Sequence, residues 1–119
     1  MVRAIRGAIT VENNNETDIL TATRELLNSI IKENNISKDD VISIIFTATR
    51  DLDAVYPAVA ARQIGFTDVA LMCTNEMYVP GSLEKCIRVM MHVNSDKKNN
   101  ELKHIYLKGA KILRPDIAK

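Results

Sequence analysis

The stretch that decides the fold is Lys85-Cys-Ile-Arg-Val-Met-Met-His-Val93. Side chains alternate between the two faces of a strand, and apolar residues here fill every second position, which predicts a β-strand. One face carries Ile87, Val89, Met91 and Val93, and the other carries Cys86, Arg88, Met90 and His92. We expect helices to cover the first face, which leaves the arginine on a second, more polar surface.

The segments around this strand have the patterns of further strands and helices. Val2–Val11 predicts a strand with Ile5, Ile9 and Val11 on one face, and with Arg6 between Ala4 and Ala8 on the other. We also expect a helix over Glu16–Asn34, a strand over Val41–Thr49, a short helix over Pro57–Ile64, and strands over Asp68–Cys73 and Lys103–Leu107.

This order of elements predicts an α/β (α+β) fold, in which helices pack on one face of a mixed five-stranded sheet. A chain of 119 residues is expected to form one domain spanning residues 1–119, and assembly with other copies would help so small a domain to bury more surface.

Charge and composition exclude several classes of protein. The chain has 16 basic and 15 acidic residues and no tryptophan, whereas nucleic-acid-binding proteins usually present a basic surface and aromatic side chains that stack on bases. No apolar run approaches the roughly 20 residues that cross a bilayer. We therefore expect no nucleic-acid partner and no membrane association.

The cysteines and histidines argue against a metal site. Cys73 and Cys86 form no Cys-x-x-Cys pair, and His92 and His104 lie too far apart in sequence for a helical ligand pair. The N-terminal segment meets Arg3 and Arg6 too early for the apolar core of a signal peptide. We expect two free thiols and a cytoplasmic location.

The informative residues are the charged groups within apolar strands. A guanidinium held against a sheet is costly unless an anion meets it, so Arg88 and Arg6 are candidates for binding a carboxylate or a phosphate. A solvated arginine or an internal salt bridge explains either residue equally well when it is considered alone.

Three further residues have simple structural explanations. Tyr106 falls on the polar face of its strand, as a partly exposed or interface tyrosine would. Glu76 follows Cys73 by three positions, so a straight strand would put them on opposite faces, as a surface carboxylate and a small buried thiol. From these residues alone we infer an α/β domain suited to a small anionic ligand.

Five segments, in order and at consistent spacing, resemble the small trimeric α/β chorismate mutases. They are Arg3-Ala-Ile-Arg-Gly-Ala-Ile-Thr-Val-Glu12, Cys73-Thr-Asn-Glu-Met77, Lys85-Cys-Ile-Arg-Val-Met-Met91, His104-Ile-Tyr-Leu107 and Leu113-Arg-Pro-Asp116. The resemblance implies a homotrimeric pseudo-barrel with active sites at the subunit interfaces. It also implies an isomerase that converts chorismate into prephenate, at the branch of the shikimate pathway toward phenylalanine and tyrosine, without a metal or cofactor.

The resemblance also assigns roles to residues. It implies that Arg6 and Tyr106 hold a substrate carboxylate, and that Arg88 reaches the ether oxygen and also a carboxylate. Glu76 and Cys73 would meet the ring hydroxyl. Tyr56 and Arg62 would come from the neighbouring subunit, and Arg114 would lie near the mouth. Arg88, Glu76 and Arg6 are the catalytic candidates. The substrate-binding set is Arg6, Tyr56, Arg62, Cys73, Thr74, Glu76, Arg88, Tyr106 and Arg114.

The chain departs from the family pattern at two positions. Tyr56 stands where phenylalanine is usual, and Val59 stands where a lysine is expected, which removes a charge near the substrate carboxylates. Two other functions stay open at this point. One is an imine-hydrolysing deaminase on a similar trimeric scaffold, although its glycine- and asparagine-containing signatures are not evident. The other is a non-catalytic sensor of an aromatic-pathway acid, which would not need Arg88.

Overall fold

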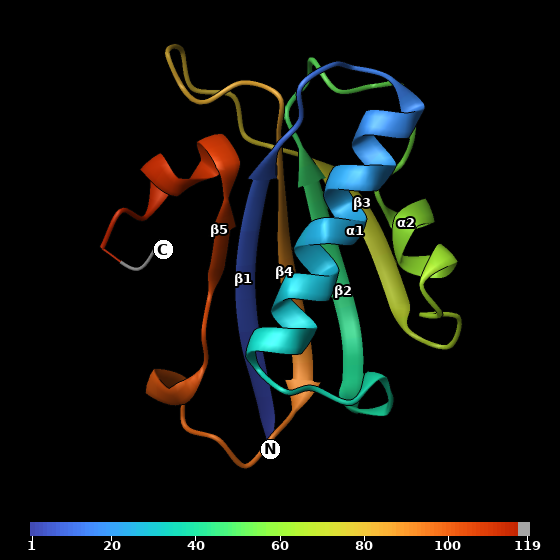
Figure 1. Ribbon diagram of the computed structural model, residues 1–119, viewed down its shortest axis with the longest axis vertical. Coiled ribbons are helices and arrows are strands. Elements are labelled where there is room, and N and C mark those ends of the chain that lie inside the picture. The colour runs from blue at the N-terminus through green and yellow to red at the C-terminus, as the bar shows by residue number, and fades with distance from the viewer. Residues whose placement is uncertain (117–119) are drawn as a thin grey trace.

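Five strands form one mixed sheet in the computed structural model, which describes residues 1–116 (Figure 1). The strands are β1 (Val2–Thr10), β2 (Val41–Ala48), β3 (Ala70–Asn75), β4 (Cys86–Asn94) and β5 (Ile105–Leu107). Their order in the sheet is β3-β2-β4-β1-β5. The central strand β4 runs antiparallel to both neighbours, while the outer pairs β2–β3 and β1–β5 are parallel. The expected mixed five-stranded sheet is therefore confirmed.

Two helices cover one face of this sheet (Figure 1). Helix α1 (Glu16–Glu33) begins after Asn15, whose side-chain oxygen accepts a hydrogen bond from the Asp18 N–H at 2.8 Å. Helix α2 (Ala58–Gln63) follows Pro57 in the crossover between β2 and β3. Short 3₁₀ segments occupy Lys38–Asp40, Asn99–Glu101 and, after β5, Lys108–Leu113, which is η3.

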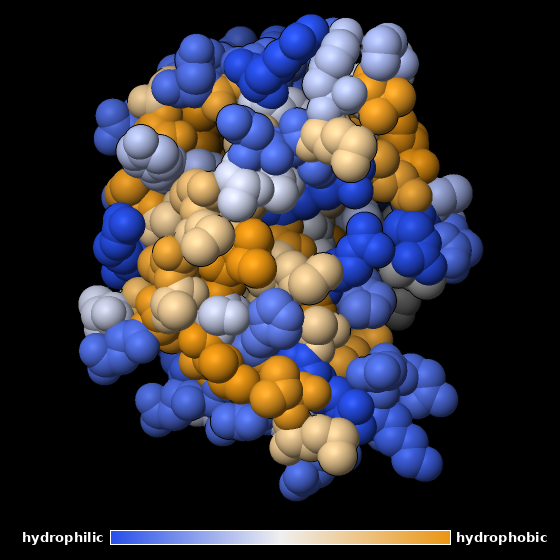
Figure 2. Space-filling view, turned by 180° about the vertical axis from the view of Figure 1, so that it is seen from behind, coloured by the Kyte–Doolittle hydropathy of each residue, from blue (hydrophilic) through white to orange (hydrophobic). Residues whose placement is uncertain are grey.

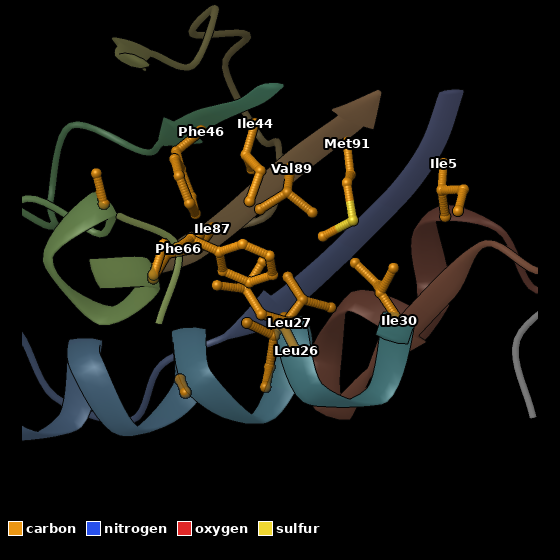
Figure 3. Packing of buried hydrophobic residues seen from close by; sticks show 14 of the residues in the cluster. Ile5, Leu26, Leu27, Ile30, Ile44, Phe46, Phe66, Ile87, Val89 and Met91 are labelled. Atoms are coloured by element: carbon orange, nitrogen blue, oxygen red, sulfur yellow. The ribbon is translucent and has the colours of Figure 1, made fainter. Parts of the chain in front are cut away.

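The core lies between the helices and the sheet (Figure 3). The expected inner face of β4 is confirmed, because Ile87, Val89, Met91 and Val93 are all buried. Helix α1 contributes an apolar stripe at helical spacing, whose buried members are Ile19, Leu20, Ala22, Thr23, Leu26, Leu27 and Ile30. This one-sided packing fixes which side chains face away from the helices.

The expected element boundaries hold to within about two residues, and the difference at β5 has a visible cause. β5 begins at Ile105 instead of Lys103, because the Arg6 N–H bonds to the His104 ring nitrogen instead of to a strand carbonyl. The N–H and carbonyl of Lys103 likewise form their hydrogen bonds with the side chain of Asn34 and not with a neighbouring strand. β3 begins two residues later than expected and continues to Asn75.

Candidate active site

The face of the sheet away from the helices carries a row of aligned residues, one from each strand. Thr74 pairs with Thr47, Thr47 with Arg88, Arg88 with Ala8, and Ala8 with Tyr106. Partners directly across neighbouring strands point to the same face. We call this surface the open face, because neither α1 nor α2 covers it and only η3 packs over its end at β5. Figure 2 shows its apolar surface, to which Val2, Ile45, Met72 and Met90 contribute exposed side chains.

Arg88 forms an ion pair near the middle of this row. Its Nε lies 2.8 Å from Oε1 of Glu76, and the Thr47 hydroxyl donates to the same oxygen at 3.3 Å. The approach to Glu76 does not follow the Nε–H direction, so this buried nitrogen has no directed hydrogen-bond acceptor within residues 1–116. The Arg88 side chain is still 36% exposed. Glu76 therefore orients Arg88 while part of its guanidinium stays accessible to a ligand anion.

Glu76 reaches Arg88 from the end of β3. The Glu76 N–H donates to the Ala48 carbonyl at 3.0 Å, which extends the β2–β3 pairing by one residue. The even-numbered residues Thr74 and Glu76 thus lie on the open face. Cys73 points the other way, pairs with buried Phe46 and packs against the core beneath the helices. The expectation that a straight strand separates Cys73 from Glu76 is confirmed.

Arg6 lies on the open face of β1, exposed and opposite Met90. It is a diagonal neighbour of Arg88, because Ala8, two residues along β1, pairs with Arg88. The Arg6 N–H donates to Nδ1 of His104 at 2.9 Å. The pKa of His104 is lowered because its burial disfavours the charged ring, and Arg6 and Arg114 add repulsion. A neutral imidazole can accept this bond, which a protonated one cannot.

Tyr106 ends the row beneath a cover of apolar side chains. Only 3% of it is exposed, because it clusters with Ala8, Cys86 and Ala110. Tyr106 is therefore more buried than the partly exposed side chain that its strand position suggests. Any ligand can contact only the small part of the side chain that stays accessible.

Arg114 lies close enough to Tyr106 to interact with it and forms a two-point pair with Asp116. Its Nε donates at 3.1 Å and its Nη2 at 3.0 Å to the two carboxylate oxygens. The Arg114 guanidinium lowers the pKa of Asp116 through this pair. The pair with Asp116 orients the Arg114 guanidinium beside the Tyr106 end of the row.

Tyr56, Arg62 and Cys73 belong to a second group on the helix side. A cavity of about 550 Å³ opens at the carboxyl ends of β2 and β3, and its wall includes Tyr56, Cys73 and Thr74. Tyr56 is 72% exposed, and Arg62 is exposed on α2. The helices and Arg88 lie on opposite faces of the sheet, so one chain does not bring Tyr56 or Arg62 to Arg88.

The cysteines and acidic groups add no second chemistry to these surfaces. Both thiols are free, and burial raises the pKa of Cys86 to about 11, which leaves it protonated and unreactive near neutral pH. Within residues 1–116 no cluster of three His, Cys, Asp or Glu side chains has the arrangement of a metal site. The described helices also include none that is long and apolar enough to cross a bilayer.

Sequence reasoning missed two residues that shape the site. The Thr47 hydroxyl donates to Glu76, and a polar residue within the apolar stretch Val41–Thr49 was the sequence feature that could have indicated this role. His104 supports Arg6, but a histidine just before a predicted strand gives no sign of its partner. Val59, in place of an expected lysine, is half-buried on α2.

Comparison with known proteins places this geometry in a family. The sequence model described as chorismate mutase type I matches residues 2–117. A relative named chorismate mutase AroH from Bacillus subtilis (strain 168) is 46% identical over 119 residues, covering 99% of this chain and 94% of that protein. A second of that name, from Thermus thermophilus, is 48% identical over 118 residues, covering 98% of this chain and 97% of that protein. A solved chorismate mutase from Clostridium thermocellum superposes with a TM-score of 0.91 at 58% identity, over 92% of this chain and 98% of that one.

Proposed function

The chain belongs to the chorismate mutase type I family, and from this membership we propose that its open face catalyses the rearrangement of chorismate to prephenate. The enzyme is an isomerase of aromatic amino acid biosynthesis. The observation that carries the proposal is the pairing of Arg88 with Glu76 on an uncovered sheet face, beside a second exposed arginine, Arg6. The free thiols fit a reducing, cytoplasmic location.

The reaction suits a site that consists of cations without an acid or base. In this Claisen rearrangement one C–O bond breaks while one C–C bond forms within the same molecule, and no proton moves. The protein has to hold the reactive conformer and to stabilise the negative charge that grows on the ether oxygen. Arginine supplies a permanent charge and two-point binding of carboxylates, of which chorismate has two. The proposal therefore requires no metal and no cofactor.

Arg88 is the group we assign to the ether oxygen. Glu76 lies against its buried Nε and fixes the direction of the guanidinium, while the side chain as a whole stays 36% exposed. A donor already held in place stabilises developing charge without first having to reorganise. Arg6 and the accessible part of Tyr106 bind a carboxylate, and Glu76 also accepts from the ring hydroxyl. Arg114 contributes positive charge near the mouth.

We assign Tyr56, Arg62 and Cys73 to the half of the site that a neighbouring copy supplies, while Thr74 lies where the two halves adjoin, on the open face and at the cavity wall. Tyr56, Cys73 and Thr74 share the cavity at the ends of β2 and β3, and Arg62 follows on α2. These residues and Arg88 serve one substrate only if the cavity end of one copy meets the open face of the next. Val59 adds no charge to this half, so Arg62 is its remaining proposed cation.

We propose that three copies form a closed ring in which each open face is covered. The exposed apolar side chains Val2, Ile45, Met72 and Met90 form a surface of the kind that marks a protein interface. In a head-to-tail contact, one surface of a copy binds a different surface of the next copy. Copies joined in this way form a closed ring when the rotation from each copy to the next adds up to a full turn. Three equivalent sites result, each with Arg88 from one copy and Arg62 from another.

The test is to incubate the purified full chain with chorismate, follow the ultraviolet absorbance of the substrate and identify the product. We expect chorismate to disappear and prephenate to accumulate in equal amount, without added metal and in the presence of a chelator. Binding of chorismate without turnover would indicate a sensor instead. Turnover of an imine substrate without turnover of chorismate would indicate a deaminase, and either result would overturn the proposal.

A further inference from the structure

Glu76 and Arg88 flank a loop, residues 77–85, that projects from one end of the sheet (Figure 1). The end of β2 holds both sides of this loop. At its start, the Glu76 N–H donates to the Ala48 carbonyl at 3.0 Å, and at its end the Thr49 N–H donates to the Cys86 carbonyl at 3.0 Å. The geometry of the Arg88–Glu76 pair therefore depends on how β2 ends.

The Asp51 carboxylate is at the centre of the hydrogen bonds that hold the end of this loop. Both of its oxygens accept from the Lys85 N–H, at 3.0 and 3.2 Å. The Thr49 hydroxyl donates to Asp51 at 2.5 Å and accepts from the Cys86 N–H at 3.0 Å. One carboxylate and one hydroxyl thus hold two consecutive backbone amides at the start of β4.

Lys85 needs this support because its backbone is left-handed, with φ of 48°. Residues with a side chain disfavour that region, which glycine adopts freely. The Lys85 carbonyl also accepts from the Val11 N–H at 2.7 Å, so the residue is held by the end of β1 as well. The turn at Lys85 sets where β4 begins, two residues before Arg88 pairs with Thr47 and Ala8.

The position of this turn matters because side chains alternate along a strand. A shift of one residue would turn Arg88 from the open face to the helix face, and a smaller displacement would move its guanidinium away from Glu76. Within residues 1–116 the Asp51 carboxylate forms hydrogen bonds with Thr49 and Lys85, and none with Arg6, Glu76 or Arg88.

We propose that Asp51 is a positioning residue, which holds Lys85 in its left-handed conformation and thereby places Arg88 for catalysis. The inference rests on the proposed function, because it needs Arg88 to act on the substrate. Asp51 does not touch the reacting atoms. Its effect passes through the backbone of Lys85 and Cys86.

The experiment is a double-mutant cycle on the full chain, with chorismate turnover as the readout. We expect Asp51→Ala to lower kcat roughly 10- to 100-fold, since small misplacements of a catalytic group have effects of this size, and to change KM less. Asp51→Asn should lose less, because its amide oxygen still accepts from the Lys85 N–H. Glu84→Ala, which removes an exposed carboxylate from the same loop, is the matched control.

The decisive variant is Asp51→Ala combined with Lys85→Gly. Glycine adopts the left-handed region without support, so the loss caused by Asp51→Ala should be several-fold smaller in the Lys85→Gly background than in the wild type. If Asp51→Ala does not fold, Asp51→Asn is compared in the same two backgrounds. An unchanged kcat in the single variant, or an equal loss in both backgrounds, would overturn the inference. A wild-type protein that does not convert chorismate would instead overturn the proposed function.

Discussion

At the scale of the residue, Arg88 is a permanent cation on a central strand, and its neighbours direct it without neutralising the whole group. Glu76 lies against Nε, and the Thr47 hydroxyl binds the same carboxylate oxygen. Arginine brings a permanent positive charge to such a position. A charge fixed in this way is most useful for an anion that appears only in the transition state, because such binding raises turnover instead of merely tightening the substrate.

Replacing Arg88 with citrulline tests this role, since citrulline keeps the shape and most donors of arginine but has no charge. We expect kcat to fall by about 100-fold or more, which is the scale of a lost oxyanion donor, with a smaller change in KM. Steady-state kinetics with chorismate gives both constants. Citrulline at Arg6 is the comparison. It should raise KM relatively more, because the substrate carboxylate that Arg6 binds is charged in both the ground state and the transition state. A raised KM with normal turnover at Arg88 would make it a docking residue.

His104 gives a second prediction at this scale, on stability. Its pKa in the folded protein is lowered from 6.5, by burial first and then by Arg6 and Arg114. The unfolded chain therefore takes up a proton first as the pH falls. The stability that neutral His104 contributes is complete above pH 6.5 and is lost as the pH falls toward the folded pKa.

Urea unfolding at pH 7.5 and at several values below 6.5 measures this loss. We expect the wild type to lose more stability over this range than His104→Asn, whose side-chain oxygen can accept from the Arg6 N–H but does not titrate. Other groups titrate equally in both proteins and cancel in the comparison. The same decline in both proteins would mean that His104 does not contribute to the pH dependence.

At the scale of the element, Asn34 joins the end of α1 to the segment before β5. Its side chain donates to the carbonyls of Ile30 and Lys103 at 3.0 and 2.9 Å and accepts from the Lys103 N–H at 2.8 Å. Only 3% of Asn34 is exposed. The segment before β5 therefore obtains from a side chain the hydrogen bonds that a longer strand would have supplied.

We expect Asn34→Ala to lower the free energy of unfolding by about 1–2 kcal/mol, because it leaves the part-buried N–H and C=O groups of Lys103 without their side-chain partners. Denaturation in urea at one fixed protein concentration measures the change, since the stability of an assembled protein depends on concentration. Asn100→Ala, at an exposed position in the same region, is the control and should change stability little. A loss no greater than that of Asn100→Ala would show that this connection is dispensable.

The sequence predicted the elements well where the pattern is local. Alternation in Lys85–Val93 placed Arg88 opposite the core, and the helical stripe of α1 was evident from spacing alone. It predicted least where a side chain replaces a backbone partner, as at Asn34 and His104, because such contacts join residues far apart in the chain. The register that aligns Thr47, Arg88 and Ala8 also depends on pairing between strands that no local pattern encodes.

For the site, the family resemblance supplied the residue types and assigned Tyr56 and Arg62 to a neighbouring subunit, but it did not separate Cys73 from Glu76. The resemblance assigned Cys73 and Glu76 to the same hydroxyl group. In one chain their side chains lie on opposite faces of the sheet, Cys73 beneath the helices and Glu76 against Arg88. Period-two alternation indicated this separation. It did not indicate that Cys73 would share a cavity with Tyr56.

At the scale of the whole molecule, the proposed site draws on two surfaces that lie apart in one copy. The open face carries Arg6, Glu76 and Arg88, and the cavity end carries Tyr56 and Cys73, with Arg62 on the adjacent helix. The exposed apolar side chains of the open face also require cover. A ring of three copies meets both needs, and sedimentation should give three times the 13.3 kDa mass of the chain.

The most direct test of a site shared between copies is to mix two inactive chains, Arg88→Ala and Arg62→Ala, under conditions that exchange subunits. Each variant alone should be inactive and should sediment like the wild type. In a closed ring of three, every mixed trimer contains one interface with both arginines intact, so equal mixing should restore about a quarter of the wild-type sites. Turnover of chorismate near that fraction, with an unchanged KM, is the result the account predicts. No recovery after demonstrated exchange would show that each chain carries a complete site of its own and would contradict the account.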